Sequence, residues 1–271
     1  MAASRCDFSF TSADSGSVMR RHKTILALLF GLLLLNLGQI SHATDDQPAR
    51  EIVDRVARLF SGKSSIATLQ MQISGEDGQR DLTMKIWTQG ENALVRIISP
   101  EKDAGTAILK RGSDIWYYLP KVKRTIKAPS SMTMTSWMGS DFTLDDLVKQ
   151  SDLVRDYSLA NSFEGKRGEV AVYEYTLTPK PGAAVVWGKI VLQVRKANLM
   201  PAWQGYYDED GKLVRELTFS DYKTMGGRLI PTRLVMRSVN KPGQQTTIVY
   251  KDVAFDVPIS AEMFSLPNLK Q

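Results

Sequence analysis

Apolar and polar residues alternate one by one over most of the chain, which is the spacing of β-strands that bury one face. In the first such segment, Leu69, Met71 and Ile73 alternate with polar residues. In the second, Met84 and Ile86 do the same after a turn-forming Gly-Glu-Asp-Gly sequence. The two segments therefore predict a β-hairpin whose apolar side chains share one face.

Short segments with this alternation continue as far as residue 255 and are separated by turn-forming residues every eight to twelve positions or so. We expect about eleven strands. A sheet of that width does not stay flat, because each strand is twisted relative to the next. The predicted fold class is therefore mainly β, with a strongly curved antiparallel sheet, a half-barrel, wrapped around a few helices.

Two stretches have helical features instead. Residues 49–60 place apolar side chains at spacings of one, three and four, which predicts an amphipathic helix. Thr143 and Asp146 match the capping pattern [ST]-x-x-[DE], which predicts a short helix reaching Val148 or Lys149. Asp141, Asp145 and Asp146 therefore serve as helix-starting residues in the simplest interpretation; a calcium site or an acid and base pair is the alternative.

The beginning of the chain has the order of a secretory signal. Basic residues precede an apolar run from Ile25 to Leu37, and Ser41-His42-Ala43 fits a cleavage site before Thr44. We expect residues 1–43 to be an N-terminal extension and cleaved signal peptide, with translation starting at Met1 or Met19, and residues 44–271 to be a single domain. An uncleaved membrane anchor is the alternative.

Cleavage at that site would remove both histidines and the only cysteine, which are His22, His42 and Cys6. The remaining chain could form neither a Ser-His-Asp nor a Cys-His nucleophilic site, and no zinc site that needs imidazole or thiolate. Carboxylate-only sites stay open, because Asp and Glu are plentiful. The net charge of +6 is modest and no nucleic-acid motif is present, so we expect no nucleic-acid partner. We expect no catalytic residues, no metal and no cofactor.

A stretch rich in methionine interrupts the strands. Met132, Met134 and Met138 lie beside Trp137 and close to Phe142, among residues typical of a loop. Methionine is flexible and polarizable, and adaptable apolar surfaces use it often. The stretch either plugs one end of the curled sheet as permanent core or forms a movable lid over a lipid-sized cavity.

Several motifs resemble those of the outer-membrane lipoprotein-sorting protein family, in its LolA-like branch. They are Asp114–Pro120 followed by Val122–Arg124, then Trp137–Leu147. Ile97–Pro100 with Gly105–Ala107, and Glu262–Leu266, fit the family as well. The matches extend over nearly the whole of the expected domain.

The resemblance implies a LolA/LolB-like domain whose curved sheet encloses a hydrophobic cavity, and a non-catalytic, chaperone-like carrier that moves a lipid or acylated lipoprotein across the periplasm toward the outer membrane. It implies an arginine that helps hold the cavity closed, although no position here can be matched to it. We expect a monomer, with an inner-membrane exporter or an outer-membrane acceptor as protein partners. The expected lipid-binding residues of the cavity and lid are Leu69, Met71, Ile73, Met84, Ile86, Trp116, Met132, Met134, Trp137, Met138 and Phe142.

Two other functions are compatible with the sequence. A non-catalytic interaction or sensor module, accessory to a membrane export system, would use the same cavity to report or to dock. An enzyme acting on a cell-envelope glycan would need two carboxylates about 5 to 9.5 Å apart in a polar cleft.

Overall fold

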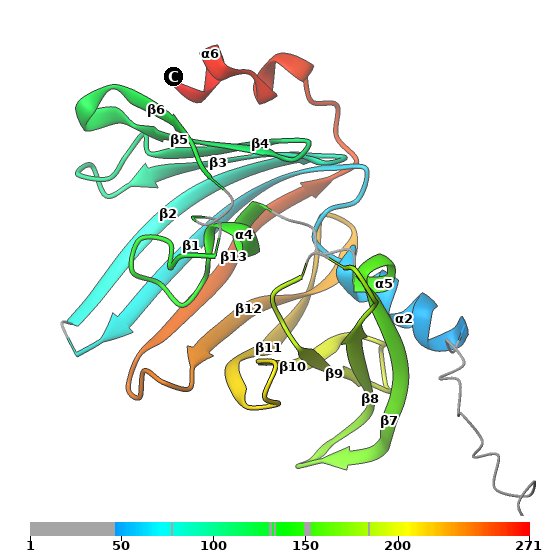
Figure 1. Cartoon of the computed structure of the whole chain (residues 1–271). Helices are drawn as coiled ribbons and strands as arrows, with labels where there is room; N and C mark the ends of the chain where they lie inside the picture. Colours follow the sequence, from blue (N-terminus) through cyan, green and yellow to red (C-terminus); the bar gives the residue numbers. More distant parts are fainter. Residues whose placement is uncertain (1–46, 77, 130–131, 133, 149–152, 184) are drawn as a thin grey trace, which may run out of the picture. The chain divides into compact units, whose positions relative to one another are not determined.

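Thirteen antiparallel strands pair into one sheet in the order β6-β5-β4-β3-β2-β1-β13-β12-β11-β10-β9-β8-β7 (Figure 1). The structure is a computed structural model that describes residues 47–271, apart from residues 77, 130–131, 133, 149–152 and 184. The expected signal peptide lies outside the described residues. The strands are β1 Ser64–Gly75, β2 Gly78–Gln89, β3 Asn92–Ser99, β4 Ala107–Arg111, β5 Asp114–Leu119, β6 Arg124–Lys127, β7 Tyr157–Arg167, β8 Val170–Pro179, β9 Lys189–Arg195, β10 Pro201–Tyr207, β11 Leu213–Met225, β12 Arg228–Ser238 and β13 Gln245–Phe255.

The mainly β fold class is confirmed, and the expected number of about eleven strands is too low. The short segments β4, β5 and β6 are separate strands of the sheet. Connections of two to four residues join β4 to β5 and β5 to β6, so each short segment pairs with the one before it. Nearly all pairings join strands that follow each other in the chain. The exception is β1, which pairs with β2 on one side and with β13 on the other. The sheet is not closed, since β6 and β7 are its two edges.

Strands β2 to β5 bury both of their faces, each against a different apolar cluster. On β3, Val95 and Ile97 belong to the first, larger cluster, whereas Leu94 belongs to the second. On β4, Ile108 and Leu109 divide in the same way. Because successive side chains of a strand point to opposite faces, the two clusters lie on opposite sides of the sheet.

Short helices complete each cluster. On the first side are α2 Gln47–Ala57, α4 Leu144–Val148 and α5 Leu153–Asp156; on the second side are the 3-10 helix η2 Ala261–Phe264 and α6 Leu266–Leu269. One more 3-10 helix, η1 Pro120–Val122, joins β5 to β6. Figure 1 shows α2 beside α5, and α6 apart from both near β4. Among the described residues, no helix has the length and apolarity needed to cross a bilayer.

The amphipathic helix predicted for residues 49–60 is present, although it ends at Ala57. Its apolar stripe buries Ala49, Val53 and Val56 in the first cluster. The chain then turns away at Gly62, which has a φ of 60° that favours glycine. A side chain there would also lie about 2.9 Å from the carboxylate of Asp256, so both the backbone and the space demand glycine.

Candidate functional site

Residues 134–148, called here the cover segment, lie against the first cluster. A short antiparallel bridge joins Ser136 to Thr143, and the Trp137 amide donates to the Phe142 carbonyl at 2.9 Å. Trp137 and Phe142 are each only 5% exposed and belong to the first cluster. The loop thus presents its large apolar side chains to the sheet, and its backbone must be held by polar groups of the strands.

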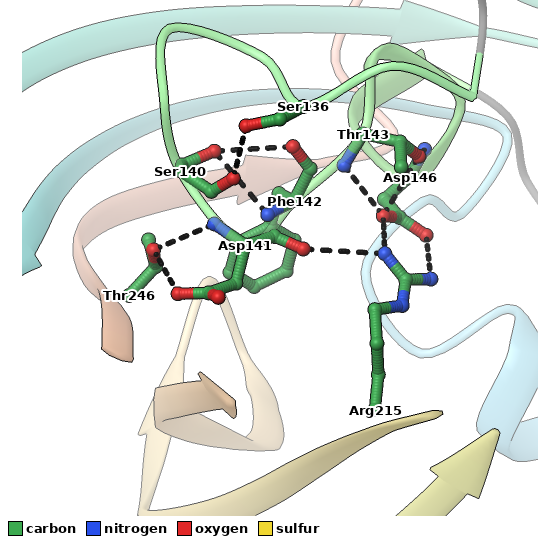
Figure 2. A network of polar contacts seen from close by, with 8 residues as sticks. All are labelled: Ser136, Ser140, Asp141, Phe142, Thr143, Asp146, Arg215 and Thr246. Atoms are coloured by element: carbon green, nitrogen blue, oxygen red, sulfur yellow. Dashed lines mark hydrogen bonds and ion pairs between the residues drawn. The ribbon is translucent and has the colours of Figure 1, made fainter. Parts of the chain in front are cut away.

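Two strands supply the first of these polar groups. Arg80 of β2 donates from Nη2 to the Met138 carbonyl at 3.0 Å. Thr246 of β13 donates from Oγ1 to the Asp141 carboxylate at 2.8 Å and accepts from the Asp141 amide at 2.9 Å (Figure 2). Thr246 is fully buried, so this reciprocal pair satisfies polar atoms that have no access to water.

The helix α4 begins with the capping arrangement that the sequence predicts. The Thr143 amide and hydroxyl donate to Asp146 Oδ2 at 2.7 and 2.8 Å, and the Asp146 amide donates to Thr143 Oγ1 at 3.1 Å. The helix extends over Leu144–Val148. The helix-starting role of Asp146 is therefore confirmed, and the same carboxylate has a second partner.

That partner is Arg215 of β11, whose guanidinium forms a two-bond ion pair with Asp146 (Figure 2). The distances are 2.7 Å from Nη1 to Oδ2 and 3.1 Å from Nη2 to Oδ1. Nη1 also donates to the Asp141 carbonyl at 3.2 Å. The Arg215 side chain is 6% exposed and that of Asp146 is 19% exposed, so water screens this pair far less than a surface ion pair.

Aromatic rings complete the surroundings of Arg215. The Trp187 and Tyr206 rings have their centres 4.7 and 4.8 Å from its Cζ atom, within the range of cation–π attraction. Tyr206 is the residue directly opposite Arg215 in the pairing of β10 with β11. Burial acts to lower the pKa of Arg215, but attraction and hydrogen bonds to Asp146 outweigh it, so the pKa is raised. The Nε atom is buried and has no hydrogen-bond partner.

The structure brings together most of the residues expected to bind lipid. Leu69, Met71, Met84, Trp137 and Phe142 are buried members of the first cluster. Ile73, Ile86 and Met138 are partly buried and pack against it. These eight residues share one side of the sheet, and their contact with lipid stays a prediction.

Three of the expected residues do not join that group. Trp116 packs against the second cluster, on the opposite side of the sheet, because it alternates with Ile115 and Tyr117 of the first side. Its place in a cavity on the first side was wrongly predicted. Met132 is 43% exposed, and Met134 is half-buried outside both clusters.

Arg215 was missed at the sequence level, although a signal was present. Arg215, Leu217 and Phe219 occupy alternate positions of one strand, and the latter two belong to the first cluster. An arginine at an apolar-face position of an alternating strand needs a buried anion, and only the fold shows which carboxylate supplies it. Within the described part of the chain, no three His, Cys, Asp or Glu side chains are grouped as a metal site requires.

Comparisons with known proteins place this fold. A family model described as "-like: Uncharacterized protein" matches residues 89–271, more than half of the chain. A search of curated proteins finds no match. Among solved structures, a DUF1329 family protein from Desulfovibrio piger is similar, with a TM-score of 0.74, 23% identity, and coverage of 82% of this chain and 98% of that one.

Two further structures are similar over the same extent. One is a protein described as an outer membrane lipoprotein-sorting protein domain from Vibrio parahaemolyticus, with a TM-score of 0.72, 24% identity, and coverage of 83% of this chain and 99% of that one. The other is a LolA superfamily protein from Nitrosomonas europaea, with a TM-score of 0.68, 20% identity, and coverage of 81% and 98%. At these identities the likeness concerns the fold.

Proposed function

The chain belongs to the DUF1329-like family, which shares its fold with lipoprotein-sorting and LolA superfamily proteins, and we propose that it is a non-catalytic periplasmic carrier of acylated cargo. The cargo is a lipid or a lipoprotein, whose acyl chains bind between the first side of the sheet and the cover segment. The carrier passes this cargo toward the outer membrane.

One observation carries the proposal: a loop with large apolar side chains covers one side of an open sheet, and polar contacts fasten it there. Trp137 and Phe142 of the cover segment belong to the same buried cluster as Met71 and Met84 of the sheet. A half-barrel that curves around this cluster would let hydrocarbon take the place of the loop's side chains against the sheet. Flexible methionines suit such an exchange of apolar partners.

The free energy of acyl burial is sufficient for this function. Each buried CH₂ group contributes about 0.8 kcal/mol, so a chain of about sixteen carbons contributes on the order of 10 kcal/mol before ordering and association costs. A carrier of this kind needs few polar contacts to the hydrocarbon itself. Its polar groups are then available to hold or release the cover.

The first experiment asks whether acyl chains bind at all. The protein is purified without detergent and examined by native mass spectrometry, and a fluorescent fatty-acid probe is titrated into the delipidated protein. We expect co-purifying acyl species and saturable probe binding. A protein that carries no acyl species and does not bind the probe would contradict the carrier function.

The second experiment asks whether the cover segment must move. Cysteines replace Asp141 and Thr246, whose side chains touch, and Cys6 is replaced by serine. We expect the oxidised form to bind the probe at least about tenfold more weakly than the reduced form, since a disulfide holds the cover in place. Each single-cysteine variant is the matched control and should bind equally in both redox states. Equal binding by the oxidised and reduced double variant would show that the cover is fixed core.

A further inference from the structure

Arg215 depends on the cover segment for its negative partners. Its three hydrogen bonds go to Asp146 Oδ1, Asp146 Oδ2 and the Asp141 carbonyl, all in that segment. The acidic side chains that act on its charge, among the described residues, are those of Asp146 and Asp141, which belong to the same segment. The neighbouring Glu216 points to the other side of the sheet, where it accepts from Trp203.

Movement of the cover segment therefore changes the electrostatics of the apolar side. The segment would take both oxygens of Asp146 and the Asp141 carbonyl with it, while Arg215 stays on β11 between apolar neighbours. The remaining contacts are the Trp187 and Tyr206 rings. A cation in an apolar environment without a carboxylate is strongly disfavoured. If the cover segment opened and a neutral cargo bound, Arg215 would be left buried without a carboxylate.

We propose that Arg215 recognises an acidic headgroup, so that the carrier selects anionic amphiphiles, and that the cargo's carboxylate or phosphate replaces the carboxylate of Asp146. The inference rests on the proposed carrier function and names its class of cargo. The guanidinium matches both groups, because its planar set of N–H donors binds two oxygens at once.

The unpaired Nε atom supports this assignment. Asp146 engages Nη1 and Nη2, while Nε is buried without a partner in a side chain that is only 6% exposed. The edge formed by Nε and Nη2 can hold a carboxylate or a phosphate with two parallel hydrogen bonds, whereas Asp146 uses the edge formed by Nη1 and Nη2. Arg215 thus has a buried donor at Nε that neither Asp146 nor Asp141 uses. Exchange of anions also links binding to opening, since the cargo competes with the residue that holds the cover.

The test compares single-chain amphiphiles of equal length and different headgroup. Palmitate, hexadecyl phosphate and hexadecanol each displace the neutral dye N-phenylnaphthylamine from the delipidated protein at pH 7. We expect both anions to bind about tenfold or more tightly than the alcohol, the gain typical of a hydrogen bond to a charged group. A stronger effect of the phosphate would identify a phospholipid-like headgroup, and a stronger effect of palmitate a carboxylate.

Three variants assign the preference to this residue. Arg215→Met should reduce the anion-to-alcohol ratio to about one, and Arg215→Lys should keep part of it, because the charge stays and the fork is lost. Asp146→Asn removes the competing carboxylate and keeps the cation, so it should increase anion affinity about tenfold and keep the preference for anions over the alcohol. Arg237→Met, at an exposed arginine on the other side of the sheet, is the matched control and should keep the native ratio.

The possible results separate the two proposals. Equal binding of alcohol and anions by the native protein would overturn the headgroup inference and leave the carrier function intact. Displacement by none of the three amphiphiles would overturn the carrier function. If Arg215→Met does not fold, Asp146→Asn still decides, since a loss of anion preference in that variant contradicts the exchange.

Discussion

Two segments cover the two sides of the sheet, and they are held by different forces. The tail segment, residues 259–269, buries Phe264 and Leu269 in the second cluster, where they are 3% and 0% exposed. Ser260 and Ser265 cap its two short helices. Two strands also contact its backbone, since Gln89 Nε2 donates to the Ile259 carbonyl and Arg96 Nη2 to the Asn268 carbonyl, but no ion pair to the tail segment is seen among the described residues. The cover segment combines apolar burial with a buried ion pair and a network of hydrogen bonds to three strands.

The two kinds of interaction differ in whether a ligand can displace the segment that they hold. Apolar burial is non-directional and adds up over area, so no single group competes with the tail segment. A buried ion pair depends on one carboxylate in one position, and another anion can take that position. The tail segment is therefore expected to be a permanent part of the core, and the cover segment to be removable by the right ligand.

Removal of the Phe264 side chain tests the apolar segment and has the largest expected effect. Phe264→Ala should lower the free energy of unfolding by about 4 kcal/mol, because a buried ring is replaced by a cavity. Denaturant unfolding measures this change. Val122→Ala, at a side chain that is 59% exposed, is the control and should change stability by less than about 0.5 kcal/mol.

The same variant separates the two segments by function. Phe264→Ala should keep its affinity for palmitate, since the tail segment lies on the opposite side from the first cluster. A loss of palmitate binding at a temperature where the variant is folded would show that the tail segment also contributes to cargo binding.

Removal of one charge tests the ion pair and has the next largest effect. Asp146→Asn should lower the free energy of unfolding by about 3 kcal/mol, since Arg215 is left buried without a carboxylate. The double variant Asp146→Asn with Arg215→Met should recover part of this loss. A double variant that is less stable than Asp146→Asn would show that the unpaired charge is not the cause.

Removal of the Thr143 hydroxyl has a smaller effect. Thr143→Ala should cost about 1 kcal/mol in denaturant unfolding, because the Asp146 amide at the start of α4 loses its acceptor. Thr143→Ser keeps the hydroxyl and should cost much less. If alanine and serine behave alike, the cap does not hold the cover segment.

Ionisation of buried tyrosines on the first side has the smallest expected effect on the free energy of unfolding near neutral pH. Burial, with a further effect of Asp156, raises the pKa of Tyr157 to about 12, and burial raises the pKa of Tyr206 and Tyr250 as well. An unfolded tyrosine has a pKa of about 10. The neutral phenol therefore stabilises the folded state fully below about pH 10, and this contribution is lost as the pH rises toward 12.

The free energy of unfolding should fall over that pH range, and tyrosinate absorbance should rise with the unfolded fraction. Tyr157→Phe should make the fall less steep, because one of the groups that titrate late in the folded state is absent. An unchanged slope would contradict the raised pKa of Tyr157.

Much of the fold could be predicted from alternation and turn residues alone. Leu69, Met71 and Met84 were assigned to one buried face by their period of two, and the structure places them there. The capping pair Thr143 and Asp146 was equally readable, because both partners lie within one helical turn. These features are local, so the chain needs no distant contact to define them.

The number of strands and the face of the sheet on which Trp116 lies could not be predicted from the sequence. Alternation along a strand shows which residues share a face. When both faces of the strand are buried, alternation does not show which face packs against which apolar cluster. Trp116 and Tyr117 are both partly buried, and Ile115 between Asp114 and Trp116 is buried. Only the packing of the tail segment against β2–β5 assigns it to the second cluster.

The sequence by itself determined the first hairpin, the apolar face that it buries and the cap of α4, since these follow from spacing and from hydrogen bonds between near neighbours. Tertiary structure decided the partner of Arg215. Asp146 and Arg215 are separated by 69 residues, and the pairing of β10 with β11 brings this arginine between Tyr206 and the cover segment. A buried charge selects its counterion by position in space, and distance along the chain carries no information about that position.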